Sequence, residues 1–182
     1  MPVMPIWDKG PGVIVYGYGE SGAAYLGKTL GDIKLAMETS SSDINEDQAG
    51  DAAVDAILTG SNVTFEAPLT RLSVEELARV MNVEIDVDGS IPIENQIGCS
   101  LYSLAKRVVI KPLCGNEVSE DPATWVELYK CYPIVSLDFT WNKETQRIVP
   151  VKFKVFVSQE SGYVGKFGRI SQRSRFPGRQ RP

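Results

Sequence analysis

The residues with the clearest chemical spacing are three glycines near the N-terminus. The stretch VIVYGYGESG carries Gly17, Gly19 and Gly22 in the G-x-G-x-x-G pattern of dinucleotide-binding turns, and Glu38 stands where a ribose-binding carboxylate would be expected. Such a site needs a crossover helix and then a parallel strand. The stretch AAYLGKTL is too short for that helix, and Gly27 interrupts it. The glycines therefore favour a turn at the start of a β domain over a phosphate cradle.

Other catalytic and metal-binding arrangements are poorly supported. The chain has no histidine, which excludes Ser-His-Asp and Cys-His pairs. Cys99, Cys114 and Cys131 are too far apart for a C-x-x-C site, so we expect three reduced thiols in or near a core. Asp86 and Asp88 in DVDGS lack the further spaced ligands of a calcium loop and indicate a turn. We expect no catalytic residue, no cofactor and no metal.

Charge is distributed unevenly along the 182 residues. The formal net charge is −4, yet from Lys166 onward there are six basic residues and no acid. The stretch from Glu38 to Asp55 carries six acids and no base. An acidic body with a basic tail suggests self-complementary assembly at least as readily as nucleic-acid binding. No apolar run reaches the length of a membrane span and no secretory signal is visible, so we expect synthesis in the cytoplasm.

Most of the periodic segments predict strands. In residues 62–72, Val63, Phe65, Ala67 and Leu69 alternate with more polar residues, and 147–158 repeats this pattern. DIKLAME (32–38) predicts a strand with Ile33, Leu35 and Met37 inside. Further strands are expected over 125–139 and 104–113. The turn NKET joins 125–139 to 147–158 as an antiparallel hairpin.

One helix is predicted, and it begins after a capping box. Ser73 can cap its N-terminus with Glu76 three residues later, and Asn82 ends it. Its apolar stripe is expected to pack against the sheet.

The expected fold is mainly β: an antiparallel β sandwich or barrel with one flanking α-helix, a long loop and terminal arms. The β domain spans residues 1–165. It includes an N-terminal arm or loop region at 1–30 and a long acidic loop at 38–60, and a basic C-terminal arm follows at 166–182.

The order of these pieces resembles a known family. The phrases GKTLGDIKLAME, DINEDQAGDAAVDAILTGSNVTFEAPL leading into SVEELARVM, and PVKFKVFVSQESGYVGKFGRI are similar to those of bacteriophage tail tube proteins, over about residues 12–170. The resemblance implies six subunits that join sheet edges into a ring, and rings that stack into a tube for DNA. Type VI secretion and contractile bacteriocin tubes share this plan.

The resemblance also implies partners and contact residues. The partners would be further copies of the chain, the tape-measure protein, the tail terminator or baseplate, a sheath where one exists, and DNA in transit, with no membrane. The protein would be a non-enzymatic virion tail component assembled in the host bacterial cytoplasm. We expect ring-to-ring contact through the acids of the long loop and contact with an acidic neighbouring surface through the basic arm: Asp43, Glu46, Asp47, Asp51, Asp55, Arg169, Arg173, Arg175, Arg179, Arg181.

Two physical arguments agree with assembly. Exposed strand edges are a liability unless another chain pairs with them, and a ring pairs them. Acid-rich segments suit a channel in which DNA must slide without adhering.

Two alternatives stay open. The basic tail could serve a nucleic-acid-binding virion or packaging accessory protein, although Phe176 is the one aromatic residue between Arg169 and Arg181 for base stacking. The other alternative is the dinucleotide enzyme suggested by the glycines.

Overall fold

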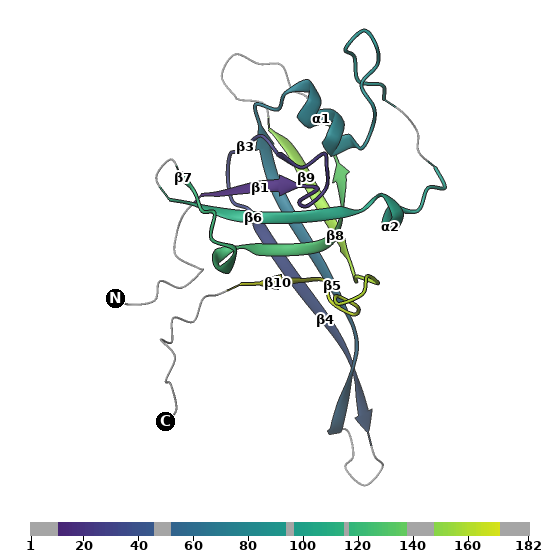
Figure 1. The fold of residues 1–182 in the computed structure, drawn as a ribbon. Coiled ribbons are helices and arrows are strands. Elements are labelled where there is room, and N and C mark those ends of the chain that lie inside the picture. Colours follow the sequence, from purple (N-terminus) through teal and green to yellow (C-terminus); the bar gives the residue numbers. More distant parts are fainter. Residues whose placement is uncertain (1–10, 46–51, 94–96, 115–116, 138–147, 172–182) are drawn as a thin grey trace, which may run out of the picture.

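The computed structural model describes residues 11–45, 52–93, 97–114, 117–137 and 148–171. Within them, ten strands form one antiparallel sheet that is accompanied by two α-helices (Figure 1). The elements are β1 (Gly12–Tyr16), β2 (Ala24–Tyr25), β3 (Lys28–Thr29), β4 (Lys34–Asn45), β5 (Ala53–Thr70), α1 (Val74–Met81), α2 (Leu101–Leu104), β6 (Lys106–Cys114), β7 (Glu117–Val118), a 3-10 helix (Pro122–Thr124), β8 (Val126–Val135), β9 (Val149–Phe156) and β10 (Gly168–Ile170). The mainly β, antiparallel prediction is confirmed.

The sheet bends on itself at β8. The main strand order is β2-β1-β6-β8-β9-β5-β3, while β4 pairs with β5, β10 with β8 and β7 with β6. Residues 126–128 of β8 pair with β6 on one side and β10 on the other, whereas residues 130–135 pair with β9. We call β1, β2, β6, β7, β10 and the first part of β8 the β6 half, and the remaining strands the β5 half. Figure 1 shows the β6 half crossing in front of the β5 half.

The main core lies between these halves. The β6 half contributes Ile14 and Val108, and the β5 half contributes Phe65 and Phe153, all at most 1% exposed. The two phenylalanine rings lie 5.0 Å apart between centroids. Burying a side chain of this size stabilises the fold by about 1.5–3 kcal/mol. The alternating pattern predicted for β5 and β9 is therefore confirmed over the part of each strand that faces the core.

The sheet is not closed. β2 pairs with β1 and β3 pairs with β5, and only Leu26 and Gly27 connect these two ends of the strand order. Leu26 is 1% exposed within the main core, so the connection covers the core without completing a ring of backbone hydrogen bonds. The barrel form is thus not reached, and the sandwich form stays a prediction.

Helix α1 begins and ends where the sequence predicts. The Ser73 hydroxyl accepts from the Glu76 amide at 3.2 Å, and Glu76 Oε2 accepts from the Ser73 amide at 2.7 Å. The other oxygen of Glu76 accepts from the Gly27 amide at 3.0 Å, which ties the helix to the β2–β3 connection. Asn82 ends the helix in the left-handed conformation, and Val80 enters the main core. A second short helix, α2, was not expected.

The glycine-rich stretch forms a turn between antiparallel strands. Gly17 and Gly19 have φ values of +72° and +87°, which glycine adopts without steric cost, and the chain then returns so that Val15 lies opposite Tyr25. Neither a helix nor a parallel strand follows, so the interpretation as a turn is confirmed.

The N-terminal arm or loop region predicted for residues 1–30 is wrong for β1, although residues 17–23 do form a turn and loop. β1 pairs with β6 along its whole length, and Ile14 and Tyr16 are in the main core. On the opposite face, Val15 packs in a second cluster with Val109 and Trp125. A strand buried on both faces is central to the body. Residues 1–10 lie outside the described residues.

The long loop predicted at 38–60 is also wrong for its described part. Residues 38–45 and 53–60 are paired strands, with Glu38 opposite Asn62 and Asp43 opposite Ala56. Both faces of these strand segments are exposed, so their residues do not alternate between apolar and polar as in a half-buried strand. Register shifts follow Ser40 and Ile44, as at β-bulges. Residues 46–51 lie outside the described residues.

The turn predicted at Asp86 and Asp88 is confirmed, and the cysteine prediction holds for one of three residues. The DVDGS stretch is a turn in which Asp88 Oδ1 accepts from the amide and hydroxyl of Ser90. Of the three thiols expected in or near a core, Cys131 is buried in the core, where burial raises its pKa, whereas Cys99 is exposed, so the expected position is wrong for Cys99. The side chain of Cys114 lies outside the described residues.

The helix cap gives a direct test of the fold. We expect Ser73→Ala to lower the free energy of unfolding by about 1 kcal/mol in urea titrations, because the Glu76 amide loses its acceptor. Ser136→Ala is the matched control, since Ser136 is exposed and begins none of the described helices. Equal stability of the two variants would contradict the role of the cap.

Candidate functional site

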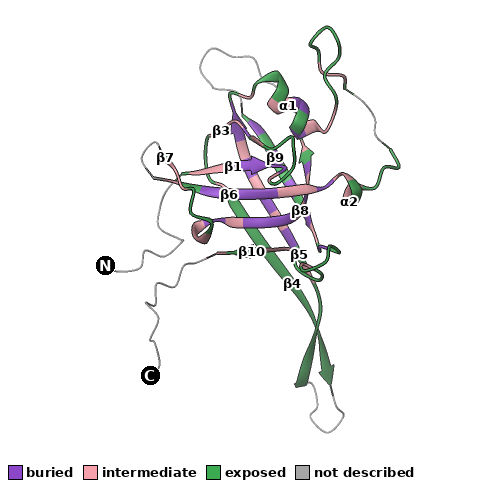
Figure 2. Ribbon diagram, in the orientation of Figure 1, coloured by how far each residue is buried: buried purple, intermediate pink, exposed green. Residues whose placement is uncertain are grey.

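The most exposed part of the described chain is a two-stranded extension, which we call the arm: residues 38–45 of β4 and 53–62 of β5. It projects beyond the body, and β4 is exposed along its whole length (Figures 1 and 2). β9 pairs with β5 only from Val63 to Leu69, so the arm consists of one strand pair. Among the described residues, no strand occupies the outer edge of β4 or the second edge of residues 53–62. Unpaired edges of this length are templates for pairing with another chain.

Apolar side chains lie uncovered where the core face of the sheet continues toward the arm. Leu35 is opposite Phe65 and Met37 is opposite Val63, so both point to the side of the sheet that holds the core. They are nevertheless 39% and 62% exposed. The expectation that Leu35 and Met37 are inside is therefore wrong for this chain by itself, because the β6 half does not pack closely against this part of β4. Ile33, the third residue of that prediction, is partly buried against the core.

The arm itself carries further exposed apolar residues that sequence reasoning missed. Val54, Ile57 and Leu58 are each at least half exposed. The signal available was the run AAVDAIL (52–58), three residues before the predicted strand at 62–72, which indicates that this strand begins earlier.

Two of the five predicted acidic contact residues lie on the arm. Asp55 is opposite Ile44, and Asp43 is the neighbour of Ile44 along β4. Adjacent residues in a strand point to opposite faces, so the two carboxylates lie on different faces of the arm. The structure therefore does not bring them together in one patch. Glu46, Asp47 and Asp51 lie outside the described residues.

One of the five predicted arginines lies within the sheet. Arg169 is in β10 and its Nε pairs with the Glu127 carboxylate, whose side chain is 6% exposed. Arg107 approaches the other Glu127 oxygen at 3.9 Å. The basic arm therefore does not begin at residue 166, because residues 168–170 are a strand of the body. Arg173, Arg175, Arg179 and Arg181 lie outside the described residues.

Close packing holds β10 against β8. A Cβ added at Gly168 would collide with the backbone oxygen of Glu127, so only glycine fits this approach. The Arg107 guanidinium lies 5.5 Å and 5.2 Å from the ring centroids of Tyr129 and Tyr163, which limits its movement. Glu127 therefore joins β6, β8 and β10 through charge.

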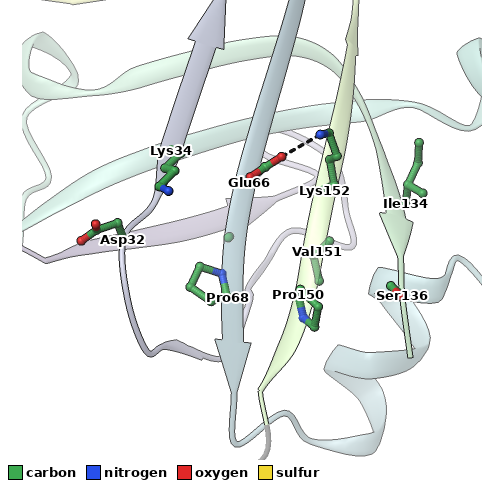
Figure 3. A pocket seen from close by; sticks show the side chains of 10 residues that line it. Asp32, Lys34, Glu66, Pro68, Ile134, Ser136, Pro150, Val151 and Lys152 are labelled. Atoms are coloured by element: carbon green, nitrogen blue, oxygen red, sulfur yellow. Dashed lines mark ion pairs between the residues drawn. The ribbon is translucent and has the colours of Figure 1, made fainter. Parts of the chain in front are cut away.

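The outward face of the β5 half carries a row of charges. Lys34 lies opposite Glu66, and Glu66 lies opposite Lys152, with 2.7 Å between Lys152 Nζ and Glu66 Oε1 (Figure 3). The ammonium of Lys152 holds the pKa of Glu66 below its usual value, and the carboxylate raises the pKa of Lys152. The row borders a hollow of about 520 Å³ beside Pro68 and Pro150. Glu66 and Lys152 neutralise each other, so the hollow offers no free acid or base from this pair.

The described residues lack a cluster of metal-binding side chains and a membrane-spanning helix. They contain no group of three or more side chains that could hold a metal ion. None of their helices is long and apolar enough to cross a membrane.

The buried carboxylate provides a test of this region. We expect Glu127→Gln to destabilise the protein by about 2 kcal/mol, since Arg169 and Arg107 lose a charged acceptor. Amide hydrogen exchange at residues 168–170 should accelerate as β10 separates from β8. Glu66→Gln is the matched control, because that ion pair is solvated and should contribute little. If both variants behave alike, the charge of Glu127 does not hold β10.

No family model matches the sequence, and no curated protein matches it.

Proposed function

We propose that this chain is a structural subunit, without enzymatic activity, of a bacteriophage tail tube. In this proposal six copies form a ring through their sheet edges, and stacked rings form the conduit for DNA. The resemblance of the sequence phrases to tail tube proteins supplies the kind of assembly. The observation that carries the proposal is the exposed β4 strand, with its unpaired edge and its uncovered apolar residues.

The argument from β4 is energetic. Met37 extends the core face of the sheet into solvent, and its burial by a neighbouring subunit would contribute about 1.5–3 kcal/mol. The outer edge of β4 also presents backbone groups that a neighbouring strand can satisfy. β10 offers a second unpaired edge on the other half of the sheet among the described residues. Two edges on different parts of one chain favour head-to-tail association, which closes into rings.

The arm is suited to the contact between rings. It extends beyond the body as a strand pair, so it can reach a surface that the body does not touch (Figure 1). Asp43 and Asp55 present charge on both of its faces, together with exposed Ile44 and Ile57. In the proposed tube these residues meet the next ring.

The alternative of a nucleic-acid-binding accessory protein has less support. Arg169, the one described arginine of the basic tail, is already paired with Glu127 and is therefore a poor phosphate ligand. Self-assembly into a tube therefore stays the proposal, and binding to DNA is measured as the competing outcome.

Assembly itself is the first test. We expect concentrated protein to form rings or tubes in negative-stain electron microscopy. Met37→Asp should raise the concentration needed for assembly about tenfold or more, since 1.4 kcal/mol corresponds to a factor of ten. Val87→Asp is the matched control, because Val87 is fully exposed on the 86–90 turn, away from β4. A protein that stays monomeric, or a tight salt-dependent complex with DNA in its place, would count against the tube.

Shortening the arm separates ring formation from stacking. Ser42 lies opposite Ile57, so residues 43–56 can be replaced by Asn-Gly as a two-residue hairpin turn. We expect rings without long tubes, because the ring edges remain and the stacking contact is gone. Tubes of normal length would show that the arm does not join rings. Asp43→Asn with Asp55→Asn is the companion variant, which removes charge without removing length.

A further inference from the structure

An apolar groove opens on the side of the body where β1 begins and β6 ends. It has a volume of about 1010 Å³ and lies between the two halves of the sheet. Ile110, Val126 and Ile170 line the wall from the β6 half, and Ile33 and Leu35 line the wall from the β5 half. The groove exists because the sheet is not closed, which leaves the halves apart on this side.

The floor of the groove is continuous with the main core. Ile33 and Ile110 are partly buried and pack against that core. A Cβ added at Gly12 would lie 3.3 Å from both of them, so the floor is closely packed at this point. Toward the opening, Leu35 and Ile170 are 39% and 49% exposed. Side chains placed between these two residues would extend the core outward.

The N-terminal residues of the same chain have the composition to fill this space. The sequence before Pro11 reads MPVMPIWDKG, in which residues 3–7 are Val, Met, Pro, Ile and Trp. Pro11 itself lines the groove. An extended chain spans about 3.3–3.6 Å per residue, so Trp7 is within about 14 Å of Pro11 and can reach the groove.

Charge and tethering favour the same occupant. The groove wall carries one acid and one base, Asp32 and Lys34. The N-terminal residues between Trp7 and Pro11 also include one acid and one base, Asp8 and Lys9, so each charge has a residue of opposite sign to pair with. A tether this short gives an effective concentration of the order of millimolar, so a modest apolar contact suffices. The basic residues after Ser171 lack such an apolar run.

We propose that residues 3–7 of the chain's own N-terminus occupy this groove, with Ile6 and Trp7 against Leu35 and Ile170. The segment completes the core on the side where the sheet is open. The proposal does not depend on ring or tube formation.

Hydrogen exchange of the unmodified full-length chain is the first test. At concentrations where the chain is monomeric, we expect amides of residues 6–9 to exchange at least tenfold more slowly than an unstructured peptide of the same sequence. Leu35→Asp should remove that protection while the amides of β9 stay protected. Exchange at the peptide rate in the unmodified chain overturns the proposal.

Cross-linking identifies the position and the chain that supplies the segment. Trp7→Cys and Ile170→Cys are combined with Cys99→Ser, which removes the exposed native thiol, and a short bismaleimide is added at low protein concentration. We expect a link within one chain, formed at least tenfold faster than in a control that pairs Trp7→Cys with Val87→Cys, a residue outside the groove. Links only between chains assign the groove to a neighbouring subunit and overturn the own-chain proposal. Equal rates in the two pairs also overturn it.

Discussion

The hydrogen bonding of β8 to strands of both halves is the constraint on which the rest of the body depends. Residues 126–128 pair with β6 and β10, and residues 130–135 pair with β9, so one strand belongs to two differently oriented parts of the sheet. The two halves must then face each other, and their inward side chains form the core. Cys131, next to this change of partners, is completely buried. Breaking the pairing of β8 would separate the layers that bury Phe65 and Phe153.

The same constraint determines what stays outside. The β6 half covers the sheet as far as Val63 on β5, while β4 and the earlier part of β5 continue past it. Met37 keeps the inward orientation of a core strand without having a layer to pack against, and Leu35 faces the groove between the halves. The arm and the groove are two consequences of one open sheet: a strand pair with free edges on one side, and an apolar gap between the halves on another.

Charge is used differently in the interior and on the surface. Glu127 is buried beside two arginines and fixes the position of β10, so part of the acidic body and basic tail neutralise each other within one chain. Lys111 is likewise nearly buried, 2.8 Å from Glu120 and 4.3 Å from the centre of the Trp125 ring. On the outward face of the β5 half, Glu66 and Lys152 are solvated and contribute mainly to the character of the surface.

Local features of the sequence determined the second half of β5, together with β9 and α1, because a two-residue alternation and a capping box act over neighbouring residues. The turn at Gly17 and Gly19 was also readable, since the segment after it was too short for a crossover helix. The sequence did not indicate three features of the structure. These are the central position of β1, the exposure of Met37 and the pairing of Asp43 with Ala56 across the arm. They depend on which distant segment lies alongside: β6 beside β1, β5 beside β4, and no layer above Met37. A polar strand exposed on both faces has the composition of a loop, and only its hydrogen bonds to another strand distinguish the two.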